Sequence, residues 1–258
     1  MSPVITRSGP RLVLVHGWGF DHRLWQGLCS ALPELDAVTI DLGFFGPPNG
    51  PAFAPDRPVV AVGHSLGVLW LLHTRPFRWH GLVSINGFPR FVDAPDYAPA
   101  VPARLVDRML RRLPADPAGV TQEFRRRCGE SAPLPDRPVP DSLLAGLIWL
   151  RHWDARPVAG GVTTPAPILA LSGGADPILP VGMDEHCFLN FPEVTTVRLA
   201  HGGHLLPLTE PDWCAGRIRE FLDGLRADAK DEARGPCPPD PDRGFALDPP
   251  RAGGPWNP

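Results

Sequence analysis

Three residues of the chain have the types and the order that activate a hydroxyl group as a nucleophile. Ser65 lies at the centre of the segment GHSLG, between the glycines at positions 63 and 67. Asp176 lies later in the chain, in LSGGADPILP, and His204 later still, in LAHGGHLLPLTEP. A histidine can accept the hydroxyl proton of a serine, and a carboxylate can orient that histidine and stabilise its charged form. The order serine, aspartate, histidine therefore predicts acyl-transfer chemistry through Ser65.

Each of these residues also has a structural alternative. Ser65 could belong to an ordinary tight turn, and Asp176 could cap a turn before Pro177, as aspartate often does. His201 competes with His204, because both follow the last predicted strand. His204 is favoured since it opens the path into the final predicted helix, and His201 is then expected to have a structural or supporting role.

The two histidines of the segment HGGH also raise the question of a metal site. Asp184, Glu185 and His186 are the other candidate ligands in this part of the chain. Two histidines three residues apart lie on one face of a helix, and no helix is predicted over HGGH. We therefore expect no metal ion, and the serine chemistry requires no other cofactor.

The elements that must position these residues are apolar runs of the length and β-branched content of buried parallel strands. Predicted helices lie between several of the runs, and this alternation predicts an α/β fold with a doubly wound, mostly parallel sheet. Functional groups should then lie at the carboxyl ends of the strands. The six predicted strands lie in residues 11–16, 36–41, 58–63, 80–87, 166–173 and 195–202.

The chain is predicted to form one large domain over residues 1–226. The alternation of strands and helices is interrupted at about residues 89–153, where only helical patterns occur, and this stretch is expected to form a helical insertion, or lid, over the catalytic edge of the sheet. Residues 227–258 are rich in proline, glycine and charge and are expected to form a disordered tail.

The segment GHSLG follows a predicted strand and precedes a predicted helix, which is the context of a nucleophile elbow. Together with Asp176 and His204 in that chain order, it resembles the α/β-hydrolase family. The resemblance implies an oxyanion loop at LVLVHGWGF, so that the backbone N–H groups of Trp18 and Leu66 would face a developing oxyanion.

Longer segments resemble one group within that family, the pimeloyl-[acyl-carrier protein] methyl ester esterases of biotin synthesis. These segments are LVLVHGWGFDHRLWQGLCSAL, DAVTIDLGFFG, and SLLAGLIWLRHWDAR leading into PAPILALSGGADPILP. The resemblance extends over about residues 12–222. It implies hydrolysis of a methyl ester on an acyl chain carried by acyl carrier protein, with Ser65 as nucleophile and Asp176 and His204 as its relay.

Two other functional classes remain open from the residues alone. One is a general short-chain carboxylesterase, lactonase or thioesterase of the same fold. The other is a non-catalytic binding protein, against which the intact set of three residues argues.

The sequence also departs from the pattern of this group. The link between residues 41 and 65 is rich in proline and glycine, so that the helix usual before the nucleophile strand is not expected there. His64 precedes the serine, where we expect a packing or rim residue, and Val68 stands where a small residue often allows close helix packing. These changes leave the chemistry intact and bear on the substrate.

Charge and composition suggest the partner. The 258 residues carry a formal net charge of −3, which predicts binding neither to nucleic acid nor to a membrane. The five cysteines lack CxxC spacing, so we expect reduced thiols and a cytoplasmic location. The protein is expected to be a monomer. Arginines nevertheless gather in the predicted insertion, where they are either a solvated helix face or a binding surface for the acidic acyl carrier protein. They are Arg104, Arg108, Arg111, Arg112, Arg125, Arg126 and Arg127.

Overall fold

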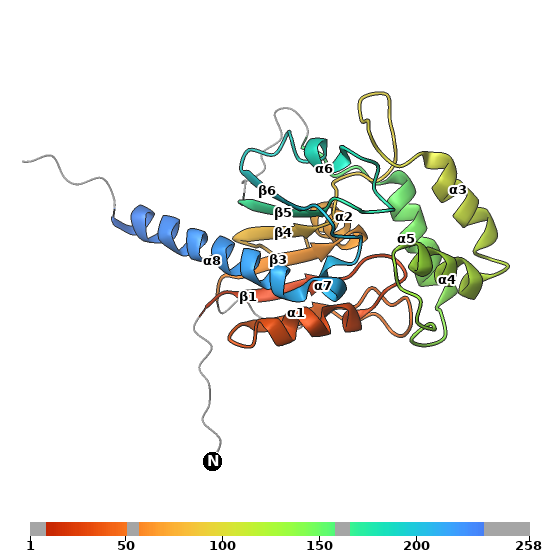
Figure 1. The fold of residues 1–258 in the computed structure, drawn as a ribbon, viewed down its shortest axis with the longest axis horizontal. Helices are drawn as coiled ribbons and strands as arrows, with labels where there is room; N and C mark the ends of the chain where they lie inside the picture. The colour runs from red at the N-terminus through yellow and green to blue at the C-terminus, as the bar shows by residue number, and fades with distance from the viewer. Residues whose placement is uncertain (1–8, 51–56, 158–165, 235–258) are drawn as a thin grey trace, which may run out of the picture.

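The computed structural model describes residues 9–50, 57–157 and 166–234. Six strands form one sheet in the order β2-β1-β3-β4-β5-β6, and all five neighbouring pairs are parallel (Figure 1). The expected mostly parallel sheet is confirmed. The strands are β1 (Arg11–Val15), β2 (Asp36–Ile40), β3 (Val59–His64), β4 (Gly81–Ile85), β5 (Ile168–Gly173) and β6 (Val194–Leu199).

The central strands are apolar because both of their faces are covered. Every residue of β3, β4 and β5 is buried, which explains why these strands are rich in valine, leucine and isoleucine. The edge strands β2 and β6 are only partly buried, and polar residues such as Thr195 and Thr196 are exposed there. The core of the molecule therefore surrounds the strand that leads into Ser65.

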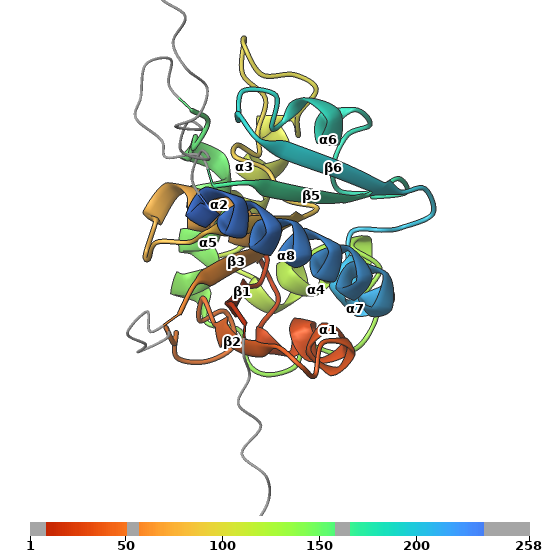
Figure 2. The ribbon, with the colours of Figure 1, turned by 90° about the vertical axis from the view of Figure 1, so that its left-hand side faces the viewer.

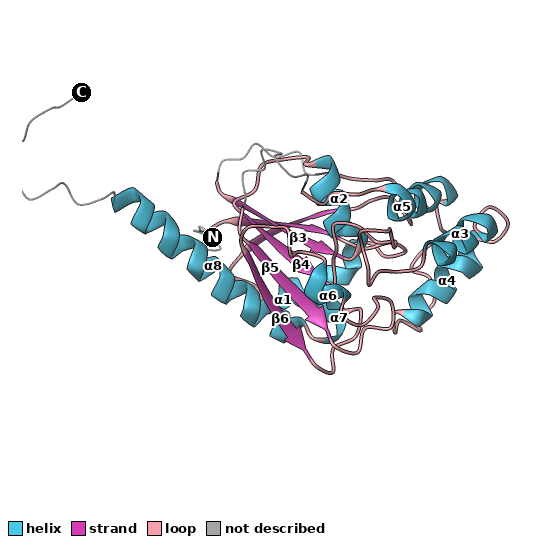
Figure 3. Cartoon of the chain, turned by 90° about the horizontal axis from the view of Figure 1, so that it is seen from above, coloured by secondary structure: helices cyan, strands magenta, loops and turns pink. Residues whose placement is uncertain are grey.

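Helices cover the two faces of the sheet. The helices α1 (Gln26–Ala31) and α8 (Pro211–Arg234) pack together on one face, and α2 (Leu66–Thr74) lies on the other (Figures 2 and 3). Short helical segments complete the fold: η1 (His22–Trp25), α6 (Met183–His186) and α7 (Leu206–Thr209). Helix α8 continues past residue 226, where the sequence suggested that a tail begins, and residues 235–258 lie outside the described part of the chain.

The stretch expected to form a helical insertion contains α3 (Ala103–Arg112), α4 (Pro117–Arg127) and α5 (Pro140–His152). Helix α4 begins with Pro117, and the Asp116 carboxylate caps it by accepting the Gly119 N–H at 2.8 Å. The three helices gather at one end of the sheet (Figure 1). We call residues 89–153 the helical insertion below.

The two ends of the helical insertion are joined at its base. An antiparallel bridge pairs Arg90 with Asp154, and the Arg90 guanidinium contacts the Asp154 carboxylate at 2.8 Å. Arg156 holds the same carboxylate at 2.7 Å, and its guanidinium lies 4.9 Å from the centre of the Tyr97 ring. These charges hold the pKa of Asp154 down at about 2, although burial alone would raise it.

The link between β2 and β3 has no helix in its described residues, 41–50 and 57–58. A cavity of about 720 Å³ lies beside this link, and Trp70 of α2 and Trp149 of α5 contribute to its wall. None of the described helices is both long and apolar enough to cross a bilayer.

Candidate active site

Ser65 occupies a strained turn between β3 and α2. Its φ of 51° and ψ of −121° lie in a region that residues with a side chain rarely adopt. The turn depends on Gly67, because a Cβ there would overlap the backbone carbonyl of Val15 in β1. Only 5% of Ser65 is exposed. The arrangement projects a serine hydroxyl at the carboxyl end of the central strand, as a nucleophile elbow requires.

Val68 fits against this turn because two glycines leave room for it. A Cβ at Gly63 or at Gly87 would meet the Val68 side chain, which is itself completely buried. The departure from a small residue at position 68 therefore leaves the elbow intact.

The structure brings Ser65, His204 and Asp176 together in one hydrogen-bonded series. The His204 Nε2 lies 3.1 Å from the Ser65 Oγ, and its Nδ1 lies 2.7 Å from Asp176 Oδ2. His204 lies in the loop between β6 and α7, and Asp176 follows β5. Both side chains are buried, at 1% and 5% exposure. The three residues thus have the contacts needed for proton transfer from the serine hydroxyl.

Asp176 makes the contacts of a turn cap with its other carboxylate oxygen. Its Oδ1 accepts the N–H groups of Ile178 at 2.7 Å and Leu179 at 3.1 Å, so the turn and the histidine share one carboxylate. Burial would raise the pKa of Asp176, but the charge of His204 and these hydrogen bonds lower it below its ordinary value. Asp176 therefore stays ionised beside the imidazole.

His201, the alternative histidine, lies on the surface. Its side chain is 73% exposed, and its Nε2 lies 3.6 Å from a carboxylate oxygen of Glu210. The structure gives it no contact with Ser65 or Asp176 within the described residues.

Two segments that adjoin Ser65 carry the backbone N–H groups expected to face an oxyanion. Leu66 begins helix α2, and Trp18 follows Gly17, whose added Cβ would meet both His64 and Ser65. Within the described residues neither the Trp18 N–H nor the Leu66 N–H has a hydrogen-bond acceptor. The Trp18 indole is fixed by a 2.8 Å hydrogen bond to the carbonyl of Leu143 in α5. Unpaired donors next to a nucleophile can stabilise a developing oxyanion.

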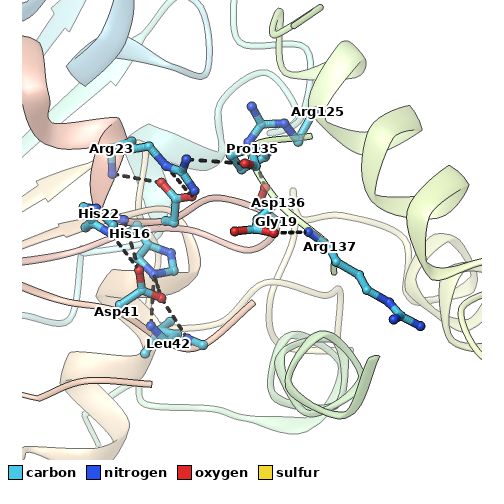
Figure 4. Close-up of polar contacts among 12 residues, drawn as sticks. His16, Gly19, His22, Arg23, Asp41, Leu42, Arg125, Pro135, Asp136 and Arg137 are labelled. Atoms are coloured by element: carbon cyan, nitrogen blue, oxygen red, sulfur yellow. Dashed lines mark hydrogen bonds and ion pairs between the residues drawn. The ribbon is translucent and has the colours of Figure 1, made fainter. Parts of the chain in front are cut away.

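The segment before Trp18 is held by a buried carboxylate. The Asp41 Oδ1 lies 3.3 Å from His16 Nε2 and accepts the Gly43 N–H at 2.9 Å, while its Oδ2 lies 3.1 Å from His22 Nδ1 (Figure 4). Burial would raise the pKa of Asp41, but His16 and these hydrogen bonds keep it well below its ordinary value. The permanent charge fixes the end of β1, from which the loop to Trp18 begins.

Arg125 lies inside the molecule and does not face solvent. Its Nη1 donates to the carbonyl of Gly19 at 3.1 Å (Figure 4). Its guanidinium also lies 4.6 Å from the centre of the Phe20 ring. Only 7% of the residue is exposed. Arg125 is therefore not accessible to a carrier protein, which corrects the expectation from the sequence, and instead ties helix α4 to the loop that carries Trp18.

The other arginines singled out in the sequence lie on the surface of the helical insertion. Arg112 pairs with Glu123 at 2.8 Å, and Arg127 lies 3.4 Å from the carbonyl of Pro177, next to Asp176. The exposed arginines are Arg104, Arg108, Arg111, Arg112, Arg126 and Arg127.

Asn86 contacts this site, although the sequence did not single it out. It follows β4, and its side chain lies between the loop of His204 and the end of β5. A polar residue directly after a central strand was the available signal, since functional groups gather at the carboxyl ends of parallel strands.

The 720 Å³ cavity beside the β2–β3 link is separate from these residues. None of Ser65, Asp176 and His204 lines it. Its volume therefore says nothing about the acyl group that Ser65 would accept.

Comparisons with known proteins agree with this geometry. No family model matches the chain. A pimeloyl-[acyl-carrier protein] methyl ester esterase from Methylococcus capsulatus is 31% identical over 246 residues, covering 83% of this chain and 95% of that protein. An enzyme of the same name from Legionella pneumophila is 29% identical over 233 residues, covering 83% of this chain and 96% of that protein.

Solved structures of esterases share the fold. An esterase from Exiguobacterium antarcticum superposes with a TM-score of 0.69 at 18% identity, covering 84% of this chain and 92% of that chain. A thermophilic esterase from Thermogutta terrifontis gives a TM-score of 0.65 at 21% identity, covering 84% and 90%. The chain is a carboxylic ester hydrolase of the α/β-hydrolase fold, and it belongs to the family of the pimeloyl-[acyl-carrier protein] methyl ester esterases.

Proposed function

We propose that this protein is a serine esterase that cleaves the methyl ester of an acyl chain carried on acyl carrier protein. The observation that carries the proposal is the hydrogen-bonded series from Ser65 through His204 to Asp176. The names of the relatives from Methylococcus and Legionella support the methyl ester and the carrier as the substrate class.

In the proposed reaction, the Ser65 hydroxyl attacks the ester carbonyl while His204 Nε2 takes its proton. Asp176 holds Nδ1 and stabilises the imidazolium that forms. His204 then donates the proton to the departing methanol, which leaves an acyl-enzyme. His204 next takes a proton from water, which attacks the acyl-enzyme, and the acid product leaves as Ser65 regains its proton.

Each attack places a negative charge on the former carbonyl oxygen. The N–H groups of Trp18 and Leu66 are the donors proposed for that charge, because Trp18 follows Gly17, which packs against Ser65, Leu66 follows Ser65 directly, and neither N–H has an acceptor in the described chain. No proposed step transfers an electron or requires a metal-bound nucleophile.

The roles of the two histidines give the first test. Replacement of Ser65 or His204 by alanine is expected to lower the turnover of p-nitrophenyl butyrate by about 10³-fold or more, with the fold retained. His201→Ala is the matched control, since His201 is exposed and contacts Glu210 instead. Near-normal turnover in Ser65→Ala or His204→Ala, or a larger loss in His201→Ala, would contradict the assignment.

The proposed carrier surface lies on helix α3. Arg104, Arg108 and Arg111 recur at helical spacing, so their exposed side chains form one basic stripe. Arginine suits the acidic side chains of acyl carrier protein and the phosphate of its pantetheine arm. Such contacts steer association and are screened by salt.

The second test compares two substrates. The triple change Arg104→Glu, Arg108→Glu, Arg111→Glu is expected to raise the KM for methyl pimeloyl-acyl carrier protein and to remove most of its salt dependence, while p-nitrophenyl butyrate hydrolysis is unaffected. Arg78→Glu is the control, because Arg78 is exposed before β4, at the amino end of the sheet. If the triple variant hydrolyses methyl pimeloyl-acyl carrier protein with unchanged kinetics, or if the unaltered protein prefers p-nitrophenyl butyrate, the result would favour a general carboxylesterase.

A further inference from the structure

His64, the residue before the proposed nucleophile, is hydrogen-bonded to the backbone of the proposed base. Its Nε2 lies 2.9 Å from the carbonyl oxygen of His204. A carbonyl can only accept, so Nε2 carries the proton and donates it. His64 is completely buried, and its Nδ1 has no partner among the described residues. One tautomer of one buried side chain thus joins the end of β3 to the loop of His204.

The surroundings of His64 keep its ring neutral. Burial lowers its pKa to about 3, and the nearby charge of His204 contributes to the same shift. The two imidazole rings lie 5.0 Å apart, centre to centre. A charged His64 would oppose the positive charge that His204 gains during catalysis, so the neutral donor suits its place.

Asn86, directly after the neighbouring strand β4, donates a second hydrogen bond to the same carbonyl. Its Nδ2 donates to the oxygen of His204 at 2.8 Å and to that of Gly203 at 2.9 Å. Its Oδ1 accepts the Gly173 N–H at 2.8 Å, at the end of β5 and shortly before Asp176. The residue has a φ of 46°, in the left-handed region that asparagine tolerates better than most residues. One amide therefore connects β4, β5 and the loop of His204.

These two contacts matter because the backbone hydrogen bonds of the loop of His204 are made by Gly202 and Leu205, and within the described residues none of them involves the backbone of His204. Residues 200–205 form neither helix nor strand, and an added Cβ at Gly203 would meet nothing within 4 Å. The His204 side chain has only two rotatable bonds, so the direction of Nε2 follows the position of its backbone. Two donors, one at the end of β3 and one directly after β4, saturate the carbonyl oxygen and fix that backbone.

We propose that His64 and Asn86 are positioning residues, which hold His204 by its carbonyl oxygen and thereby aim its imidazole at Ser65. The inference rests on the proposed roles of Ser65 and His204 and adds two residues whose hydrogen bonds go to the backbone carbonyl of His204, not to Ser65 or to the His204 ring nitrogens. Small displacements of a catalytic group cost large factors in rate. Loss of either hydrogen bond to the His204 carbonyl should therefore lower kcat and leave KM nearly unchanged.

The test replaces His64 with two side chains that separate donation from packing. In His64→Leu the apolar volume stays and the donor is lost, while in His64→Gln an amide N–H stands near the place of Nε2. His64→Leu is expected to lower the kcat for p-nitrophenyl butyrate by about 10- to 100-fold, with KM within about twofold. His64→Gln should restore most of that loss. A residue that only packs would give the reverse order, because leucine suits an apolar site better than glutamine.

Two controls assign a negative result to its cause. His80→Leu, at an exposed position before β4, should leave the kinetics unchanged. Full activity in Ser65→Ala would refute the proposed function itself. A loss of activity in Ser65→Ala together with full activity in His64→Leu would refute only the positioning role.

A measurement on the unaltered protein covers the case in which the variants fold poorly. Nitrogen-15 NMR at about pH 6 should show His64 neutral, with its proton on Nε2. A protonated ring, or a proton on Nδ1, would overturn the inference, since neither fits a neutral donor to the His204 carbonyl. Asn86→Asp adds a parallel test. A carboxylate cannot donate to the carbonyls of Gly203 and His204, so this variant should have a lower kcat and a nearly unchanged KM. A normal kcat would show that Asn86 does not position His204.

Discussion

Mild acid is expected to destabilise the folded protein through His64. The pKa of this residue is about 3 in the folded chain, against an ordinary value of 6.5, because burial and then the charge of His204 disfavour its protonated form. The unfolded chain therefore binds a proton at a pH at which the folded chain does not. The stability contributed by neutral His64 is complete above about pH 6.5 and is lost as the pH falls toward 3.

The size of the effect follows from the two pKa values. Protonation of His64 in the unfolded state lowers the free energy of unfolding at about pH 5 by about 2 kcal/mol, compared with neutral pH. This is a large share of the 5–15 kcal/mol that typically stabilises a domain. Asp176 and Asp41 have lowered pKa values, so their own acid-linked losses belong mainly below about pH 4.

Urea unfolding of the protein and of His64→Gln at about pH 7.5 and pH 5 measures this contribution. Glutamine does not titrate, so the variant should lose about 2 kcal/mol less between the two conditions than the unaltered protein. Histidines that do not interact with His64 contribute equally in both proteins and cancel in the comparison. Equal losses in both proteins would show that His64 is charged, or solvated, in the folded state and would refute the reasoning.

Two further predictions concern stability. Arg125→Met should lower the free energy of unfolding by about 1–3 kcal/mol, because it removes the hydrogen bond to Gly19 and the contact with the Phe20 ring. The control Arg126→Met, at an exposed position, should lower it by less than about 0.5 kcal/mol. Similar losses for both variants in urea unfolding would show that the contacts of Arg125 do not stabilise the fold. Gly67→Ala should abolish soluble active protein, since its Cβ would overlap Val15, whereas Gly216→Ala, in open space within α8, should stabilise by about 0.5–1 kcal/mol on thermal melting. An active Gly67→Ala protein would show that the turn at Ser65 can accommodate a Cβ at position 67.

The strands were predictable from the sequence because a buried parallel strand must be apolar on both faces. The runs over β3, β4 and β5 are mostly apolar, with Ser84 and Ser172 as polar residues among them. The order of neighbours was not predictable in the same way, because strand pairing joins residues that are far apart in the chain. The residues that meet at Ser65 could be chosen because parallel strands all end at one edge.

The contacts of single side chains were harder to predict. Arg125 stands in a run of three arginines, which reads as a solvated face, yet the packing of α4 against the loop at Gly19 buries that one residue. His64 was expected to pack, and it does; its hydrogen bond to His204 depends on a loop 140 residues away. Asn86 follows the apolar strand β4, and its only signal in the sequence was that of a polar residue after a central strand. In each case the partner comes from a distant segment, which local pattern cannot show.

The joined base of the helical insertion bears on how enzymes of this type diversify. The chain leaves the sheet after β4 and re-enters at β5, which pair directly, and the bridge between Arg90 and Asp154 joins the two ends of the insertion outside the sheet. The entropy cost of closing a loop grows only slowly with its length, so the two strands are almost indifferent to how much chain lies between them. A longer or shorter insertion between these joined ends is therefore expected to leave the pairing of β4 with β5, and the residues at the carboxyl edge of the sheet, in place.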